Sequence, residues 1–411
     1  MNSAHRTLPD HLSFEQRLLT QMVCPNCLKE GLTTFYRVSE VPVHSCQLLS
    51  TCEEALAFPK GDIELAFCST CGFITNICFD VGFNDYSKHY ESTQTFSGEF
   101  SRFLKSYTQC LIKKYDVRGK QVIEIGCGNG EFLSLLCQMG GNRGIGIDPA
   151  FRPERGPKIP GVDITFIQDL YSEQYSHLRA DVICCRHTLE HIQLTHDFLT
   201  TIRRTIQSTN KPLIFFDLPD AFRVLREGAF WDIYYEHCTY FTSYSLAKLF
   251  QDTGFDIVDL TFDYGDQFMV ICANPNNRER RGSFREVPHD LAIVVDAIDR
   301  FSQVCSERIE YWQNLIQDLN RKGKRVVLWG SGSKAVAFLT TLGLGSEIEY
   351  VVDINPHRQG HFMPGMSQQI VAPSFLSQYR PDTIIVMNPI YVEEIKQDLL
   401  RLDVSAELLA V

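Results

Sequence analysis

The sequence predicts an α/β protein in which parallel strands alternate with helices. Short apolar runs recur between residues 121 and 218, and segments with helical spacing separate them. Two apolar runs end in glycine-rich turns, Gly126-Cys127-Gly128-Asn129-Gly130 and Gly330-Ser331-Gly332. Glycine lets the backbone approach a ligand closely, and the helix that follows presents its N-terminus to the ligand. The two turns therefore predict two Rossmann-like units in one chain.

Length and composition indicate a globular protein with more than one domain. A chain of 411 residues is too long for a single ordinary core, and 44% hydrophobic residues can supply a sizeable interior. The net charge of -11 argues against nucleic acid and anionic membranes as partners. No apolar run approaches the roughly 20 residues that span a bilayer, and residues 1–10 lack the apolar core of a signal peptide. We expect a cytoplasmic protein, with a monomer as the default state.

The first segment carries a candidate metal site. Cys24 and Cys27 form one C-x2-C pair, and Cys68 and Cys71 form a second. Two such pairs supply the four thiolates of a tetrahedral zinc site, which would be closed and structural. The alternative is that the thiols are paired without a metal.

A candidate cofactor pocket follows from the first Rossmann-like unit. Parallel strands are expected at residues 121–125, 144–148, 163–167, 181–185 and 212–218, with an antiparallel hairpin at 254–258 and 267–273. Helices are expected from Phe100 to Tyr115 and from Ser245 to Thr253. Asp148, at the end of the second strand, is placed to accept two ribose hydroxyls. Asp169, beyond the third strand, is either an adenine contact or a helix N-cap.

Three further segments are candidates for the substrate side of this pocket. The turn after the fourth strand contains His187, Glu190 and His191, and a segment after the fifth strand contains Tyr234-Tyr235-Glu236-His237. An imidazole beside a carboxylate suits general base chemistry near neutral pH. Residues 83–92, which include Tyr86 and Tyr90, are either an interdomain linker or a substrate loop.

The last part of the chain predicts the second, smaller unit. A long amphipathic helix from Leu291 to Arg321 precedes the second glycine turn, and further strands are expected at 349–353 and 383–387. The turn is not a phosphate-binding Walker loop, because Ser333 stands where glycine should precede the lysine. Lys334 is either a diphosphate contact at a helix N-terminus or an ordinary surface lysine.

Taken together, these motifs resemble a known family. The first turn, G-x-G-x-G with an acidic strand end beyond it, suits S-adenosylmethionine better than a dinucleotide, and the strand order resembles a class I methyltransferase. The two cysteine pairs, the E-I-G-x-x-x-G core at 124–130, the Y-x-E-H segment at 234–237 and V-V-D-x-N-P-x-x-Q-G-x-x-x-P-G at 351–365 look like the nucleotide-deoxysugar C-methyltransferases. The likeness runs from about Cys24 to Pro373.

The resemblance implies methyl transfer from S-adenosylmethionine to C3 of a nucleotide-linked 4-keto-6-deoxyhexose. His237 matches the family's base, Glu236 would orient it or hold sugar hydroxyls, and Tyr234 and Tyr90 would hydrogen-bond the enolate. His191 matches a second active-site histidine, with His187 as the alternative. Substrate contacts would include Lys334, Tyr86 and His187, and cofactor contacts would include Glu124, Gly126, Gly128, Gly130, Asp148 and Asp169.

The implied organisation is a zinc-binding domain (1–85), a methyltransferase domain (86–276) and a C-terminal Rossmann-like domain (277–411) that binds the nucleotide sugar. Two other functions remain open from the sequence. One is methylation of a hydroxyl or an amine of a small molecule, and the other is a nicotinamide-dependent sugar oxidoreductase that uses the second glycine turn. A zinc-dependent binding module with an inactive methyltransferase core is disfavoured by the intact first turn and by Glu236-His237.

Overall fold

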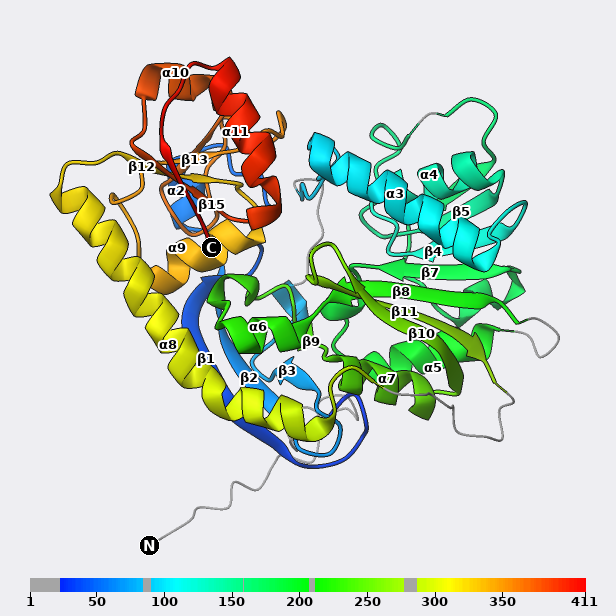
Figure 1. The fold of residues 1–411 in the computed structure, drawn as a ribbon. Coiled ribbons are helices and arrows are strands. Elements are labelled where there is room, and N and C mark those ends of the chain that lie inside the picture. Colours follow the sequence, from blue (N-terminus) through cyan, green and yellow to red (C-terminus); the bar gives the residue numbers. More distant parts are fainter. Residues whose placement is uncertain (1–22, 84–89, 158, 207–210, 277–286) are drawn as a thin grey trace, which may run out of the picture.

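The computed structural model describes residues 23–83, 90–157, 159–206, 211–276 and 287–411. Their strands form a four-stranded, a seven-stranded and a five-stranded sheet (Figure 1). Tyr86, expected to contact the substrate, lies outside the described residues.

The seven-stranded sheet confirms the predicted parallel sheet with an antiparallel edge. Its strand order is β10-β11-β8-β7-β4-β5-β6, with β4 to β8 mutually parallel and β10 and β11 forming the antiparallel hairpin beside β8. The strands are β4 (Gln121–Ile125), β5 (Arg143–Ile147), β6 (Ile164–Ile167), β7 (Val182–Arg186), β8 (Leu213–Pro219), β10 (Phe255–Asp263) and β11 (Phe268–Pro275).

Helices cover both faces of this sheet, because successive side chains of a buried strand point to opposite faces. Val122 packs in one core with α3 and α4, and Ile123 packs in another with α5 and α7. These helices are α3 (Gly98–Tyr115), α4 (Glu131–Gly140), α5 (Thr195–Thr205) and α7 (Ser243–Asp252). Two helices begin two residues earlier than predicted, because Ser97 and Thr242 cap them by accepting hydrogen bonds from the amides of Phe100 and Ser245.

The C-terminal unit is a five-stranded parallel sheet with the order β14-β13-β12-β15-β16, which confirms the second Rossmann-like unit. Its strands are β12 (Val326–Trp329), β13 (Tyr350–Val352), β14 (Gln369–Val371), β15 (Thr383–Val386) and β16 (Glu407–Ala410). Its helices are α9 (Ser333–Leu342), α10 (Leu376–Tyr379) and α11 (Val392–Arg401).

The four-stranded sheet joins two distant parts of the chain. β1 (Leu32–Pro42), β2 (Lys60–Cys68) and β3 (Ile74–Asn76) come from the N-terminal segment, which also contains α2 (Cys52–Leu56). The edge strand is β9 (Thr239–Tyr240), which follows His237 directly and pairs antiparallel with β3. The sheet therefore crosses the boundary expected at residue 85.

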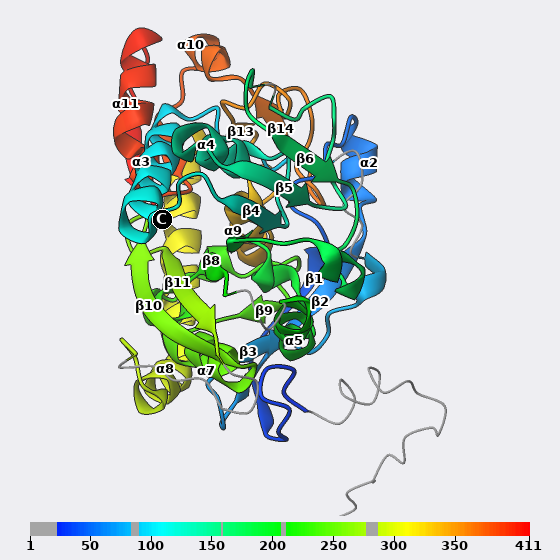
Figure 2. The same cartoon turned by 90° about the vertical axis from the view of Figure 1, so that its right-hand side faces the viewer.

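The long helix α8 (Leu291–Arg321) has the predicted bounds and unites all three parts. It runs past β1 and the short helix α6 (Ala221–Glu227) to reach α9 (Figure 1), and Figure 2 shows the same arrangement turned by 90°. Its buried face, with Phe301 and Trp312, belongs to one core that includes residues of the N-terminal sheet, α6 and the C-terminal sheet. No helix in the described part of the chain is long and apolar enough to cross a membrane.

Candidate active site

One cavity of about 1100 Å³ lies between the seven-stranded sheet and the C-terminal unit. Its walls include both glycine turns, the loops after β5, β7 and β8, and the segment from Tyr234 to His237. Ligands of open parallel sheets bind beyond the carboxyl ends of the strands, and here two such ends face the same space. The cavity, whose wall includes His237, is therefore large enough for two ligands.

The first glycine turn is shaped for close approach of a ligand. Gly126, Gly128 and Gly130 all have positive φ values (71°, 54° and 88°). A Cβ at Gly126 would lie 2.0 Å from Thr188 Oγ1, and a Cβ at Gly130 would lie 2.4 Å from the Phe166 ring. Neither position therefore admits another residue without displacement of its neighbour.

Three carboxylates lie on the cavity wall around this turn. Asp148 accepts hydrogen bonds from the amides of Gly128 (2.8 Å) and Ala150 (2.7 Å), and burial raises its pKa. Burial raises the pKa of Glu124 to about 8, so this side chain is mostly protonated at pH 7. Asp169 is not the N-cap of the following short helix, which begins after Ser172. It accepts hydrogen bonds from Tyr175 Oη (2.6 Å) and Gln174 Nε2 (2.8 Å).

The predicted base lies in a cluster of aromatic and imidazole rings. His237 is 8% exposed, and its ring centroid is 4.2 Å from that of Tyr234 and 4.8 Å from that of His191. Burial, together with the neighbouring His191, His187 and Lys334, holds the pKa of His237 well below 6.5. The imidazole is therefore neutral at pH 7 and able to accept a proton.

Both candidate histidines of the β7 loop line the cavity. His191 is fixed by a 2.9 Å contact between Nδ1 and the carbonyl oxygen of Glu236. His187 has a positive φ of 43° and packs its ring edge against Phe268, with centroids 4.4 Å apart. His191 is thus in contact with the His237 ring, and His187 occupies a more exposed part of the wall.

The Glu236 carboxylate is held by other groups than the His237 imidazole. It accepts hydrogen bonds from the Ser45 amide and from Tyr90 Oη (3.1 Å). This is not the arrangement expected of a carboxylate that orients His237. The structure instead brings Oε1 of Glu190, from the 3-10 helix η3 (Leu189–His191), to 4.0 Å from His237 Nε2.

The N-terminal sheet anchors the segment that carries His237. The carbonyl oxygen of Cys238 accepts hydrogen bonds from the Asn76 amide (2.9 Å) and from Thr75 Oγ1 (3.0 Å). Tyr235 Oη accepts a 2.9 Å hydrogen bond from the Asp80 amide. The position of the predicted base therefore depends on the cysteine-rich part of the chain.

The second glycine turn forms the opposite end of the cavity. The amide and Oγ of Ser331 donate hydrogen bonds to Oδ2 of Asp353 (2.9 Å and 2.5 Å), at the end of β13. Arg358 is buried and donates a 2.6 Å hydrogen bond to the Ser331 carbonyl oxygen. These hydrogen bonds hold the turn and the N-terminus of α9 in place at the cavity wall.

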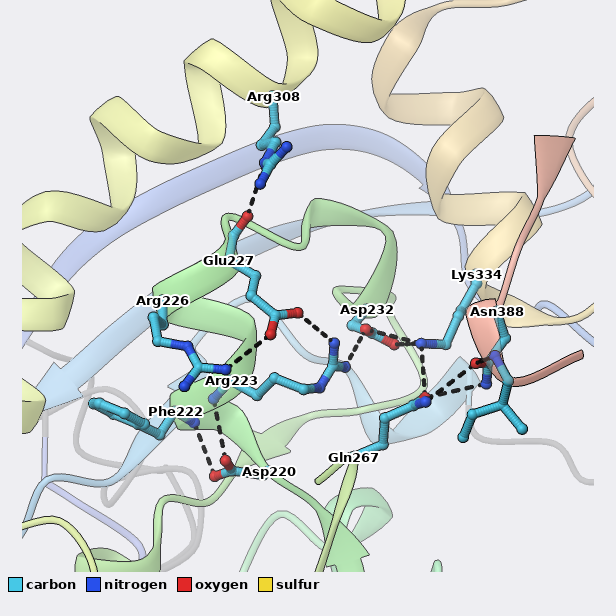
Figure 3. Close-up of polar contacts among 11 residues, drawn as sticks. Asp220, Phe222, Arg223, Arg226, Glu227, Asp232, Gln267, Arg308, Lys334 and Asn388 are labelled. Carbon is cyan, nitrogen blue, oxygen red and sulfur yellow. Dashed lines mark hydrogen bonds and ion pairs between the residues drawn. The ribbon is translucent and has the colours of Figure 1, made fainter. Parts of the chain in front are cut away.

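Lys334 is not a solvated surface lysine. Its Nζ lies 2.8 Å from Asp232 Oδ1 and 3.5 Å from Gln267 Oε1, which in turn accepts a 3.1 Å hydrogen bond from Asn388 Nδ2 (Figure 3). Asp232 also accepts a hydrogen bond from Arg223 (2.5 Å). Burial lowers the pKa of Lys334 although Asp232 opposes that effect. This network links the seven-stranded sheet to the C-terminal unit at the cavity wall.

A buried carboxylate next to Tyr90 joins the same parts on another side. Glu91 is fully buried and accepts hydrogen bonds from the Thr93 amide (3.0 Å), Asn355 Nδ2 (3.1 Å) and Arg155. Burial favours the neutral acid, but these hydrogen bonds outweigh that effect and lower the pKa of Glu91 to about 2. No sequence pattern singled out Glu91, since its partners lie far along the chain.

Replacing Glu91 by glutamine is expected to lower the free energy of unfolding by about 3 kcal/mol at pH 7, because the change removes a fully buried carboxylate and leaves its partly buried partner Arg155 uncompensated. The pKa of Glu91 is lower in the folded state, so its contribution is present above about pH 4.5 and is lost as the pH falls toward 2. Urea unfolding at pH 7 and at pH 3 measures the free energy of unfolding. Wild type and Glu91→Gln should differ less in this free energy at pH 3 than at pH 7. Glu173→Gln, which removes an exposed ion pair with Arg204, is the control and should change stability little. Equal losses for both variants would contradict the assignment.

The four predicted cysteine ligands converge. Their sulfur atoms lie within 4.8 Å of one another, with 3.6 Å between Cys24 and Cys71 and 3.7 Å between Cys27 and Cys68. Tetrahedral zinc with Zn–S bonds of about 2.3 Å requires sulfur separations of about 3.8 Å. Asn26 Nδ2 lies 3.7 Å from Cys71 Sγ, as a donor to a bound thiolate would. The donor set therefore fits a structural zinc ion.

Comparisons with known proteins agree with this architecture. Residues 96–260 match a family model described as a methyltransferase domain, and residues 293–404 match one described as a C-methyltransferase C-terminal domain. The C-methyltransferase NovU of Streptomyces niveus is 26% identical over 322 residues, which cover 75% of this chain and 76% of NovU.

Solved structures share only part of the fold. A 1,6-didemethyltoxoflavin-N1-methyltransferase of Burkholderia thailandensis is 16% identical, with a TM-score of 0.33 over 44% of this chain and 82% of that one. The magnesium protoporphyrin IX methyltransferase of Synechocystis PCC 6803 is 16% identical, with a TM-score of 0.34 over 43% of this chain and 84% of that one. These likenesses are too slight to carry an argument. The two family models and the curated relative support a C-methyltransferase family for this chain, and they identify it as an S-adenosylmethionine-dependent methyltransferase.

Proposed function

We propose that the enzyme methylates C3 of a nucleotide-linked 4-keto-6-deoxyhexose. The observation that carries the proposal is the single cavity that runs from the first glycine turn, past His237, to the second glycine turn. A methyl donor at one end and a nucleotide at the other would bring the donor's methyl group and the sugar together near His237. A sugar that is linked to a nucleotide would occupy the end of the cavity that the methyl donor leaves free.

His237 is the general base in this proposal. A C–H bond next to a ketone is acidic enough for a positioned neutral imidazole, and its removal leaves an enolate whose carbon is nucleophilic. S-adenosylmethionine supplies the methyl group as an electrophile. In this proposal Tyr234, which lines the cavity, donates a hydrogen bond to the enolate oxygen, and Tyr90, which also lines the cavity, does so after turning its O–H away from Glu236. Burial raises the pKa of Tyr234 well above 10, so it remains a donor.

The C-terminal turn is the proposed site for the nucleotide diphosphate. The N-terminus of α9 favours negative charge, and Lys334 lies in its first turn. Because Asp232 already pairs with Lys334, a diphosphate has to share the ammonium group with that carboxylate. We also propose zinc as the ion held by Cys24, Cys27, Cys68 and Cys71, with a structural role only.

Substrate deuterated at C3 tests the reaction. A panel of 4-keto-6-deoxyhexoses linked to different nucleotides is incubated with S-adenosylmethionine, and mass spectrometry follows methyl gain and deuterium loss. We expect one or more members to gain a methyl group with loss of the deuterium from C3. Methylated product that retains the C3 deuterium would indicate methylation of a hydroxyl or an amine instead. Tight binding of NADH without binding of S-adenosylhomocysteine would favour an oxidoreductase.

A further inference from the structure

Glu190 is a buried carboxylate that the proposed mechanism does not use. It is 2% exposed, and neither side-chain oxygen has a hydrogen-bond partner among the residues with assigned positions. Burying a carboxylate in this way is costly, so such a group in a cavity wall calls for an explanation. Glu190 lines the same cavity as His187 and His237.

The carboxylate is close to a buried and to a partly exposed imidazole. Its Oε1 is 4.0 Å from Nε2 of His237, whose side chain is 9% exposed, and 3.5 Å from Nδ1 of His187, whose side chain is 32% exposed. Catalytic hydrogen bonds are often longer than ideal without substrate, so both gaps are short enough to close when a substrate binds. Glu190 Oε1 thus lies within 4.0 Å of both imidazoles, of which that of His187 is the more exposed.

His187 is held in position at a conformational cost. Its backbone lies in the left-handed region with φ 43°, which a non-glycine residue adopts only when the surroundings require it. Its amide donates a 2.9 Å hydrogen bond to the Asp217 carbonyl oxygen, and its ring packs against Phe268. The surroundings therefore keep His187 within reach of Glu190.

The reaction releases one proton that must leave the site. The C3–H electron pair forms the enolate and then the new C–CH3 bond, while the sulfonium becomes a thioether, so each turnover leaves a proton on the base. His237 is buried, and the other ionisable groups that face it include His191 and Lys334, both of which disfavour its protonated form. An imidazolium at this position has to pass its proton on before the next turnover.

We propose that Glu190 relays this proton from His237 to His187, a role that rests on the proposed function. The imidazolium of His237 gives its proton to Glu190 Oε1, which becomes a neutral acid. Glu190 then gives the proton to Nδ1 of His187, and His187 releases it to water. Both the base and the carboxylate return to their starting charges, and one proton has left.

Glu190→Gln separates the relay from a merely structural role. The amide keeps the shape of the side chain but cannot carry the proton, while His237 can still remove one C3 proton. With the ketosugar that wild-type enzyme methylates, the single-turnover rate should stay within about threefold of wild type, and steady-state turnover should fall at least about tenfold. A burst of one product per enzyme should therefore appear. Glu190→Asp should recover part of the turnover, and Glu173→Gln, at the exposed ion pair, should behave as wild type.

Isotope exchange supplies the second measurement. In D2O with S-adenosylhomocysteine bound, wild type should exchange the C3 hydrogen of the ketosugar for deuterium, and Glu190→Gln should exchange it at least tenfold more slowly. Equal exchange and equal steady-state rates in both proteins would overturn the relay and leave the proposed function standing. An equal fall of single-turnover and steady-state rates would also overturn it, in favour of a structural role. If wild type methylates none of the ketosugars, the proposed function fails and the relay fails with it.

Discussion

Replacing His237 by alanine is expected to lower kcat about 10³-fold and to leave affinity for S-adenosylhomocysteine nearly unchanged. A positioned general base contributes about 10²- to 10⁴-fold to a rate, and His237 is a neutral imidazole in the wall of the cavity. In the described part of the chain, the first glycine turn does not hydrogen-bond to His237, so cofactor binding should persist. Methyl transfer assays and calorimetric titration with S-adenosylhomocysteine measure the two effects.

The pH profile adds an independent check on His237. Because its pKa lies well below 6.5, the imidazole stays deprotonated as the pH is lowered through 6.5. As the pH is lowered, kcat/KM should therefore begin to fall only well below pH 6.5. His177→Ala, which removes an exposed ring outside the cavity, should retain wild-type turnover. Unchanged turnover in His237→Ala would remove His237 as the base.

Replacing Cys68 by serine is expected to lower the free energy of unfolding by more than about 4 kcal/mol, because loss of a structural metal site is among the most destabilising changes. Cys68 ends β2 and is fully buried beside the other three sulfur atoms. The bound zinc should fall from one ion per chain toward zero. Thermal unfolding and elemental analysis of the purified protein measure both effects.

Activity should fall together with the metal, since β3 of the same sheet holds β9 and the Cys238 carbonyl next to His237. Cys110→Ser replaces an exposed cysteine of α3 and is the matched control, which should keep its zinc and its stability. If Cys68→Ser were as stable as wild type, these four cysteines would not be a structural metal site.

Local patterns were sufficient for the elements whose signals are short-range. The strands β4 to β8 and β11 lie within two residues of their predicted bounds, because period-two apolar runs and turn residues are local features, whereas β10 extends five residues beyond its predicted end at residue 258. The long helix α8 matches at both ends for the same reason. The two C-x2-C motifs could also be assigned to one metal site from their spacing alone, since the spacing of ligands along the chain reflects the geometry of the metal.

Long-range contacts were beyond these patterns. The residues around Thr239 carry no pattern that predicts a strand of the N-terminal sheet. The residues around Glu91 likewise give no indication of its partners Arg155 and Asn355. The sequence placed Glu236 beside His237 along the chain, whereas folding turned that carboxylate toward Ser45 and Tyr90.

The amino-acid sequence alone was enough to predict two glycine turns, a C-methyltransferase resemblance and the residue types for base chemistry, because backbone conformation and metal spacing are encoded over a few residues. Folding determined that both turns open into one cavity and that Glu190, not Glu236, approaches Nε2 of His237. The physical reason is that a side chain's neighbours are set by packing between elements far apart in the chain. Successive residues such as Glu236 and His237 can therefore face different partners.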